Sequence, residues 1–145
     1  MIGLLQRVSS ASVSVGGQCV GEIGPGLMVL SCVRREDTPK DAARLAERIV
    51  GYRVFPDEAG RMNRSLADTG EGLLLVPQFT LAADTRKGTR ASFTKAAAPE
   101  MGQEYFDLLV KACRDLHPDV QTGEFGADMQ VSLVNDGPVT FWLES

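Results

Sequence analysis

The sequence is poor in the residues that most hydrolytic and metal-dependent active sites use. It has one histidine, His117, and three scattered cysteines, Cys19, Cys32 and Cys113, with no C-x-x-C pair. This excludes a zinc site built from three His or Cys ligands of one chain. His117 precedes Pro118 at an expected helix end, where an imidazole commonly binds the last carbonyl groups. Cys113 is one helical turn earlier and could reach His117, but its apolar context favours a buried structural thiol.

Other absences narrow the class of protein. The longest apolar runs, Leu27–Leu30 and Leu73–Val76, are too short to span a membrane. The first 15 residues contain no basic region followed by a long apolar stretch, so no secretory signal is expected. Together with unpaired cysteines in apolar surroundings, this predicts a cytoplasmic protein. No P-loop and no G-x-G-x-x-G motif is present, so nucleotide-cofactor chemistry has no support.

The periodicity of the apolar residues predicts one α+β domain over residues 1–145, a twisted sheet with two helices. Strand patterns cover 3–8 with 13–15, 18–23, 27–33, 52–55, 73–76, 128–134 and 139–143. One helix is expected to begin after Thr38, end at Gly51 and bury Ala42, Leu45, Ala46 and Ile49. A second is expected from Pro99 to His117, with Met101, Tyr105, Leu108, Ala112 and Leu116 on its apolar face. Residues 85–98 are expected to form a loop.

Two segments have candidate chemistry. Pro77-Gln78-Phe79-Thr80 directly follows a buried apolar strand, where backbone N–H groups leave the ladder and can face a ligand. An ordinary strand-to-loop transition is the alternative. Asn135-Asp136-Gly137-Pro138 combines glycine with the only kind of peptide bond in which the cis form costs little. An ordinary hairpin turn is the favoured explanation of this segment taken alone, because only about 5% of X-Pro bonds are cis.

Together these segments closely resemble the signature motifs of the D-aminoacyl-tRNA deacylase family. The resemblance is carried by PQFTLAADTRKGTRASF (77–93), ADMQVSLVNDGPVTFWLES (127–145), IGLLQRVSSASVSV (2–15) and RVFPDEAGRMN (53–63). It is collinear over essentially the whole chain, which is therefore identified as a member of that family with its barrel-like mixed or antiparallel sheet.

The resemblance implies a cytoplasmic homodimer that hydrolyses the ester between a D-amino acid and the terminal adenosine of tRNA, without metal or cofactor. Gln78, Phe79 and Thr80 then line the aminoacyl-adenosine pocket, and their backbone groups hold the ester. Gly137 and Pro138 match the family's Gly-cisPro motif, which enters the partner subunit's pocket, so the active site lies at the dimer interface. Arg7 matches the arginine that fixes this loop, in the neighbourhood of Met129. No membrane or DNA partner is expected.

The resemblance also implies a mechanism that a chain with one histidine can perform. The 2′-hydroxyl of the terminal ribose lies beside the ester and can assist attack, while backbone N–H groups stabilise the oxyanion. Thr80 is the alternative nucleophile, with no base near it in sequence. A main-chain wall excludes L side chains but cannot exclude glycine, so glycyl-tRNA, including glycine mischarged on alanine tRNA, is an expected substrate.

Two positions depart from the family pattern. Pro77 replaces the usual serine, which removes a hydroxyl and a backbone donor, and Ala91 replaces a proline in the following loop. Pro77 leaves open an alternative, a module that binds the tRNA terminus without catalysis. A generic esterase is a further alternative, but the sequence has no nucleophile elbow.

The charge distribution bears on the nucleic-acid partner. Lys and Arg total 15 and Asp and Glu 19, which gives a net charge of −4. This excludes a histone-like protein that covers nucleic acid with a largely basic surface. Residues 85–98 nevertheless contain Arg86, Lys87, Arg90 and Lys95 and no acid. The alternative is a solvated loop. Next to the expected adenosine pocket, we predict that Arg86, Lys87 and Arg90 contact tRNA, with binding weakened by salt.

Overall fold

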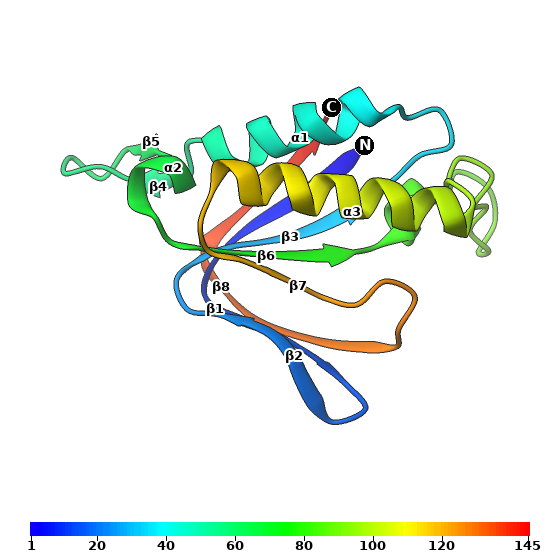
Figure 1. Cartoon of the computed structure of the whole chain (residues 1–145), viewed down its shortest axis with the longest axis horizontal. Coiled ribbons are helices and arrows are strands. Elements are labelled where there is room, and N and C mark those ends of the chain that lie inside the picture. The colour runs from blue at the N-terminus through cyan, green and yellow to red at the C-terminus, as the bar shows by residue number, and fades with distance from the viewer.

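The computed structural model describes all 145 residues and is organised around the first strand, β1 (Ile2–Val15). On one side, β1 pairs first with β3 (Gly26–Cys32) and then with β2 (Gln18–Ile23). On the other side, both halves pair with β8 (Met129–Glu144). The sheet continues from β3 through the parallel strands β6 (Gly72–Pro77) and β7 (Val120–Thr122). Figure 1 shows β2 and the lower parts of β1 and β8 bending away from the helices.

Small residues allow the sheet to curl on itself. A Cβ atom at Gly21 of β2 would lie 2.6 Å from the carbonyl oxygen of Thr122 of β7, so these two outer strands approach closely. A Cβ atom at Gly26 would lie 1.9 Å from the Gly72 carbonyl oxygen where β3 and β6 begin. The mixed, barrel-like sheet of the predicted α+β fold is therefore confirmed.

Two long helices, α1 (Pro39–Gly51) and α3 (Pro99–Leu116), lie side by side over one face of the sheet (Figure 1). The predicted apolar stripe of α1 is buried as expected. The predicted stripe of α3 is wrong by about one position: its buried residues are Gly102, Phe106, Leu109, Val110 and Cys113, and Leu116 is half exposed. The main core lies between the two helices and β1, β3 and β6. No helix of the structure is long and apolar enough to cross a membrane.

Several short elements were not predicted. They are β5 (Met62–Arg64), the single turn α2 (Leu66–Thr69), the 3₁₀ turn η1 (Phe79–Ala82) and β7. The strand expected at 52–55 forms only at its end, as β4 (Phe55–Pro56). The interrupted strand expected at 3–15 is the continuous β1. The two strands expected at 128–134 and 139–143 do not form a hairpin, because both pair with β1 as parts of β8.

Candidate active site

A mostly apolar cavity of about 890 Å³ opens where β3 and β6 end. Its floor comes from the last residues of these strands, and its walls come from η1, residues 93–99, the start of α3 and the loop before β8. Its lining includes Ser31, Cys32, Pro77, Gln78, Phe79, Phe93, Met101, Phe106, Phe125 and Met129. Gln78 and Phe79 therefore line a pocket, as predicted. Phe93, Met101 and Phe125 were not predicted, because their apolar side chains carry no sequence signal that separates a pocket wall from a core.

Backbone donors are free at the mouth of this cavity. The Gln78 N–H continues the β3–β6 ladder by donating to the Ser31 carbonyl oxygen at 2.7 Å. The next bonds close η1, from Leu81 N to Gln78 O (3.4 Å) and from Ala83 N to Thr80 O (3.1 Å). The intervening N–H groups of Phe79 and Thr80 donate to no other group of the chain, as the first donors of a helical turn do. The prediction of free donors thus holds for Phe79 and Thr80, but it is wrong for Gln78.

Two aromatic rings flank these donors. Phe79 and Phe93 are 58% and 43% exposed, and their ring centroids are 5.2 Å apart in a tilted arrangement. Exposed aromatic faces of this kind stack on nucleobases. The Thr80 side chain is exposed and is not among the cavity-lining residues.

The cavity walls contain no Asp, Glu or His. Burial raises the pKa of the Cys32 thiol, which donates weakly to the Phe79 carbonyl oxygen at 3.5 Å and so remains protonated at neutral pH. His117 is buried away from the cavity, with its Nε2 2.6 Å from the Glu71 carbonyl oxygen, so the predicted contact with the last carbonyl groups of its own helix is wrong and the imidazole instead joins the end of α3 to the segment before β6. Burial raises the pKa of Cys113 to about 12, as expected of a structural thiol. The site therefore combines free backbone donors with an apolar cavity, and no side chain in the cavity walls can act as a base.

The Gly137–Pro138 segment is a bulge in β8, and its peptide bond is cis. Thr140 lies opposite Gln6 of β1, whereas Asn135 lies opposite Val8, so residues 136–139 project from the ladder. At Gly137, φ is +135°, and a Cβ atom would lie 2.7 Å from Val139 Cγ2, which explains the glycine.

Arg7 and Asn135 hold this bulge. Arg7 donates from Nη1 to the Val54 carbonyl oxygen (2.7 Å) and from Nε to the Asp136 carbonyl oxygen (3.1 Å). The Asn135 side-chain amide donates to the carbonyl oxygens of Arg7 (2.8 Å) and Val139 (3.0 Å) and so closes the neck of the bulge. The predicted Arg7 contact therefore exists, and Asn135 adds a second fastening.

The two predicted motifs do not meet within one chain. No residue of 135–139 lines the cavity. Arg7 pairs with Leu27, five residues along β1 from the Ile2–Cys32 pair beside the cavity, a separation of about 17 Å at the usual rise of a strand. Met129 lines the cavity but pairs with Val15, so its expected proximity to Arg7 is wrong. The first half of β8 pairs with residues 10–15 of β1 and the second half with residues 2–6, so the two halves lie along different parts of the bent β1.

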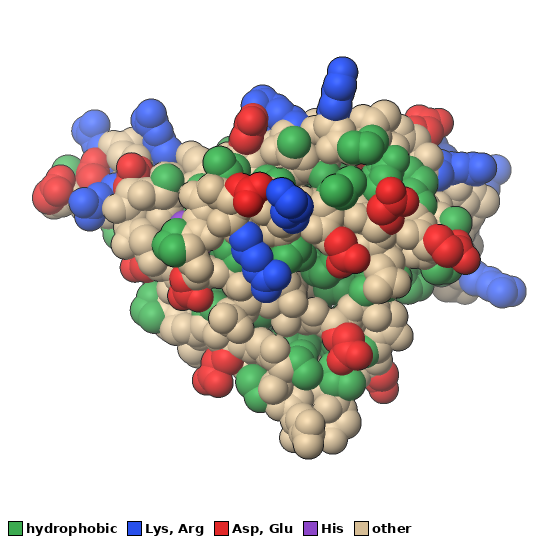
Figure 2. All heavy atoms as spheres, viewed as in Figure 1, with side chains coloured by type: hydrophobic (Ala, Val, Ile, Leu, Met, Phe, Trp, Pro, Cys, Tyr) green, Lys and Arg blue, Asp and Glu red, His purple; other side chains and the backbone are tan.

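The basic loop is less positive than its composition suggests. Arg86 makes hydrogen bonds of 2.5 to 3.1 Å with both carboxylate oxygens of Asp84, just outside the 85–98 segment, and this pairing lowers the pKa of Asp84. Neither Arg86, Lys87 nor Arg90 lines the cavity. Figure 2 shows Lys and Arg side chains projecting at the right-hand edge, where Figure 1 places this loop.

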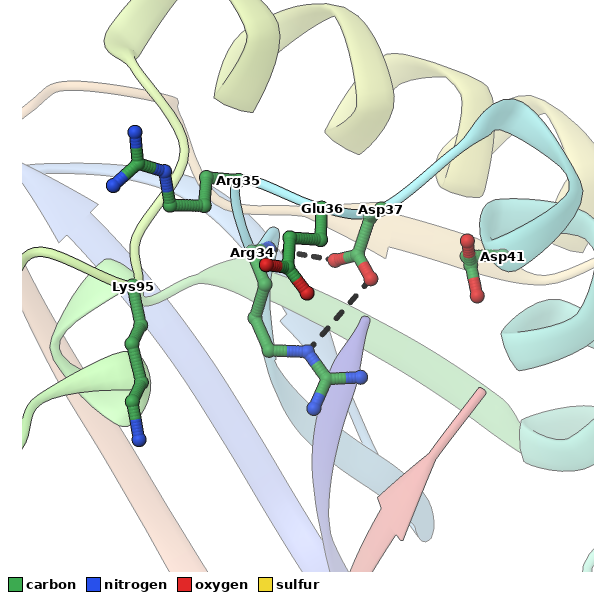
Figure 3. A pocket seen from close by; sticks show the side chains of 6 residues that line it. All are labelled: Arg34, Arg35, Glu36, Asp37, Asp41 and Lys95. Carbon is green, nitrogen blue, oxygen red and sulfur yellow. Dashed lines mark hydrogen bonds and ion pairs between the residues drawn. The ribbon is translucent and has the colours of Figure 1, made fainter.

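A second cavity, of about 440 Å³, is lined only by charged residues: Arg34, Arg35, Glu36, Asp37, Asp41 and Lys95 (Figure 3). Arg35 also lines the first cavity, so the two adjoin. Sequence reasoning missed Arg35, although its place directly after the buried strand ending at Val33 was an available signal.

Comparison with known proteins agrees with the motifs. Residues 4–144 match the family described as D-Tyr-tRNA(Tyr) deacylase. The chain is 68% identical over 144 residues to the D-aminoacyl-tRNA deacylase of Thioalkalivibrio sulfidiphilus, covering 99% of this chain and 97% of that protein. It is 63% identical over 145 residues to the corresponding deacylase of Alkalilimnicola ehrlichii, covering 100% and 97%.

Solved structures share the fold. One named "c-Myc DNA Unwinding Element Binding Protein" superimposes with a TM-score of 0.95 at 38% identity, covering 100% of this chain and 99% of that chain. Another, described as a probable eukaryotic D-amino acid tRNA deacylase, gives 0.84 at 18% identity, covering 99% and 98%. The second likeness concerns the fold alone.

Proposed function

The chain belongs to the D-aminoacyl-tRNA deacylase family, and on that premise we propose how its cavity hydrolyses the ester. The enzyme is a hydrolase that releases D-amino acids from tRNA. The proposal is that the main chain of residues 78–80 positions the aminoacyl-adenosine and that the substrate's own 2′-hydroxyl assists the attack. The observation that carries it is the pair of free N–H groups of Phe79 and Thr80 beside a cavity without a side-chain base.

The free donors suit the charge that develops during ester hydrolysis. Attack on the carbonyl carbon creates an oxyanion, and each preorganised donor aimed at it contributes about 10²- to 10³-fold in rate. No water-activating carboxylate or imidazole lines the cavity, so proton transfer is assigned to the vicinal 2′-hydroxyl of the ribose. Adenine stacks on the Phe79 and Phe93 rings, which are exposed at the mouth.

We further propose that a second copy of the chain completes the site. Gly137 and Pro138 are held rigidly yet lie outside their own cavity, so they are available to enter another one. β8 pairs only with β1 and leaves its other edge free, and Val131, Val134 and Trp142 along it are exposed. A free strand edge with apolar side chains favours pairing with another chain. A homodimer that inserts each bulge into the partner's cavity uses both features.

Chiral selection follows from such a wall. The Gly137–Pro138 main chain placed beside the substrate Cα excludes an L side chain, while a D side chain points away from it. Glycine has no Cβ atom to exclude. Glycyl-tRNA, including glycine mischarged on alanine tRNA, is therefore a proposed substrate. Purified enzyme that clears D-tyrosyl-tRNA but leaves glycyl-tRNA intact at the same concentration would contradict this.

The chemistry is tested by changing the substrate and the enzyme separately. D-tyrosyl-tRNA esterified at the 3′-oxygen of a terminal 2′-deoxyadenosine is expected to lose at least 100-fold in kcat, the size of one general acid–base contribution. Cys32→Ala and Thr80→Val are expected to keep turnover within a few-fold, since neither side chain is activated. Abolished turnover in either variant, with the deoxy substrate still cleaved, would restore a side-chain nucleophile.

The remaining partner assignments are also proposals. Arg86, Lys87 and Arg90 stay candidates for tRNA contact, although the Asp84 ion pair makes Arg86 the weakest of them. A cytoplasmic location is supported by three free cysteines, two of them buried.

A further inference from the structure

Arg35 stands at the boundary between the two cavities. It lines the apolar cavity that contains Gln78 and Phe79, and it lines the charged cavity beside it. Lys95, another lining residue of the charged cavity, lies directly opposite: the Arg35 N–H donates to the Lys95 carbonyl oxygen at 3.0 Å. Two positive side chains are thus carried on facing backbone positions of the charged cavity, which adjoins the apolar cavity at Arg35.

The backbone that carries these two residues is fixed. Arg34 and Ala96 form an antiparallel bridge, and the Ala97 N–H donates to the Val33 carbonyl oxygen at 3.1 Å. The Arg35 guanidinium uses one N–H for the Thr94 carbonyl oxygen (3.1 Å) and has its other donors free. The charges therefore occupy set positions and are not carried on a free loop.

Two of the three acids of the charged cavity, Asp37 and Asp41, are occupied elsewhere. Asp37 accepts from the amino group of Met1 (2.7 Å) and from the Arg34 N–H (2.6 Å). Asp41 accepts from the Thr38 N–H (2.7 Å) and the Ser145 hydroxyl (2.8 Å).

Arg35 and Lys95 have no carboxylate within ion-pair distance, unlike Arg34, which pairs with Asp37 and Glu144. In Figure 3 the Glu36 carboxylate lies on the Arg34 side, away from the ends of Arg35 and Lys95.

We propose that Arg35 and Lys95 bind successive phosphates of the single-stranded RNA 3′ end as it leaves the apolar cavity. This rests on the proposed function, which places the terminal adenosine in that cavity. A strand leaving an adenosine there passes Arg35 first, because Arg35 lines both cavities.

A single free anion fits the geometry less well than a strand does. The ends of Arg35 and Lys95 point in different directions in Figure 3, so they do not converge on one point. Phosphates along an extended strand are spaced apart and can meet each of them in turn. The sequence-predicted candidates Arg86 and Lys87 line neither cavity.

The test measures binding of two RNAs that carry no amino acid. One is an acceptor-stem hairpin with a four-nucleotide single-stranded 3′ end, and the other is the same hairpin made blunt. Arg35→Gln and Lys95→Gln are each expected to weaken binding of the first RNA about two- to fivefold, the range for exposed charge contacts. Each is also expected to lower the slope of log affinity against log salt by about 0.7, the single-strand value per phosphate. Neither is expected to alter binding of the blunt RNA.

Arg44→Gln and Lys111→Gln are matched controls, because each removes one exposed positive charge from a helix away from both cavities. The assignment is wrong if Arg35→Gln and Lys95→Gln bind the RNA with the single-stranded 3′ end as tightly as the controls do. It is also wrong if they weaken binding of both RNAs equally. Deacylation of D-tyrosyl-tRNA by the unaltered enzyme is measured in parallel. Its absence would overturn the proposed function without changing what the binding comparison shows.

Discussion

The strongest prediction concerns Arg7, which ties the Gly137–Pro138 bulge to the body of the protein. Its guanidinium bridges the carbonyl oxygens of Val54 and Asp136, and its side chain is only 15% exposed. Arg7→Lys keeps the charge but replaces a planar fork with a single nitrogen, which cannot span both carbonyl groups. One hydrogen bond to a charged group is lost, worth about 1.5–3 kcal/mol before relaxation.

This loss has a defined consequence for selectivity. The bond to Asp136 is the one that holds the bulge, and it is the more exposed, with the Asp136 side chain 59% exposed. Because exposure and relaxation reduce that value, we expect a cost of about 1–2 kcal/mol, around and below the lower end of the range, in the free energy that holds the wall in place. Since about 1.4 kcal/mol corresponds to a factor of ten, the D-to-L ratio of kcat/KM should fall about 5- to 30-fold.

The assay compares kcat/KM for D-tyrosyl-tRNA and L-tyrosyl-tRNA, alongside urea unfolding of each variant. Arg53→Lys is the control, because Arg53 is exposed and donates no hydrogen bond within the chain. Gly137→Ala is the complementary variant: its Cβ atom would lie 3.3 Å from Arg7 Nη2 at a φ of +135°, so it disturbs the wall directly. If Arg7→Lys is destabilised yet keeps the original D-to-L ratio, the bulge does not set selectivity and the reasoning is refuted.

Three further predictions follow from local geometry. Pro77→Ser should change kcat/KM less than threefold, because the Gln78 N–H already continues the ladder to β3. The N–H that Pro77 lacks would face the β7 side of β6, where β7 has already ended. A large gain in kcat/KM would show that Pro77 weakens the enzyme. In the native protein at pH 8, a thiol reagent should label Cys19 alone, since burial raises the pKa of Cys113 to about 12 and also raises that of Cys32; rapid labelling of three thiols would contradict the buried positions. Hydrogen bonds from Thr38 and Ser145 lower the pKa of Asp41 to about 2, so its contribution to stability is present above about pH 4 and is lost as the pH falls toward 2. Asp41→Asn should cost about 0.5–1 kcal/mol at pH 7, the size of an acidic contribution in the first turn of a helix, and should flatten the fall of Tm between pH 4 and 2; parallel curves would refute this.

The long elements were predictable because their signals are local. The stripe of α1 repeats at helical spacing after Thr38 and Pro39, and it is buried as expected. β7 and β5 were missed because three-residue strands depend on a partner brought by the fold, and no short window of sequence contains that partner. The stripe of α3 was misplaced because Tyr105, Leu108 and Ala112 border the core while Phe106 and Leu109 fill it, and both sets repeat at helical spacing.

The site divides in the same way. Gln78 and Phe79 were predicted to line a pocket, and Gly137 to precede a cis peptide bond, because motif and backbone chemistry coincide at these positions. Arg35 and the wall residue Phe125 were not, because their roles depend on which segments lie beside the ends of β3 and β6. The Arg86–Asp84 pair shows the opposite error, in which a charge counted as free within one segment is paired by a residue just outside it.

Net charge was a poor guide to the RNA partner for a physical reason. Several acids are consumed by the fold: Asp41 and Asp68 accept from the N–H groups at the starts of α1 and α2, and Asp57 accepts from those of its own turn. Carboxylates bound to backbone donors in this way present less negative potential to an approaching phosphate than free ones do. Arg35 and Lys95 have no carboxylate within ion-pair distance, so two positive charges stay unpaired at the charged cavity within an acidic protein. What decides whether an RNA end can approach is therefore which charges the fold leaves unpaired, and where, rather than their sum.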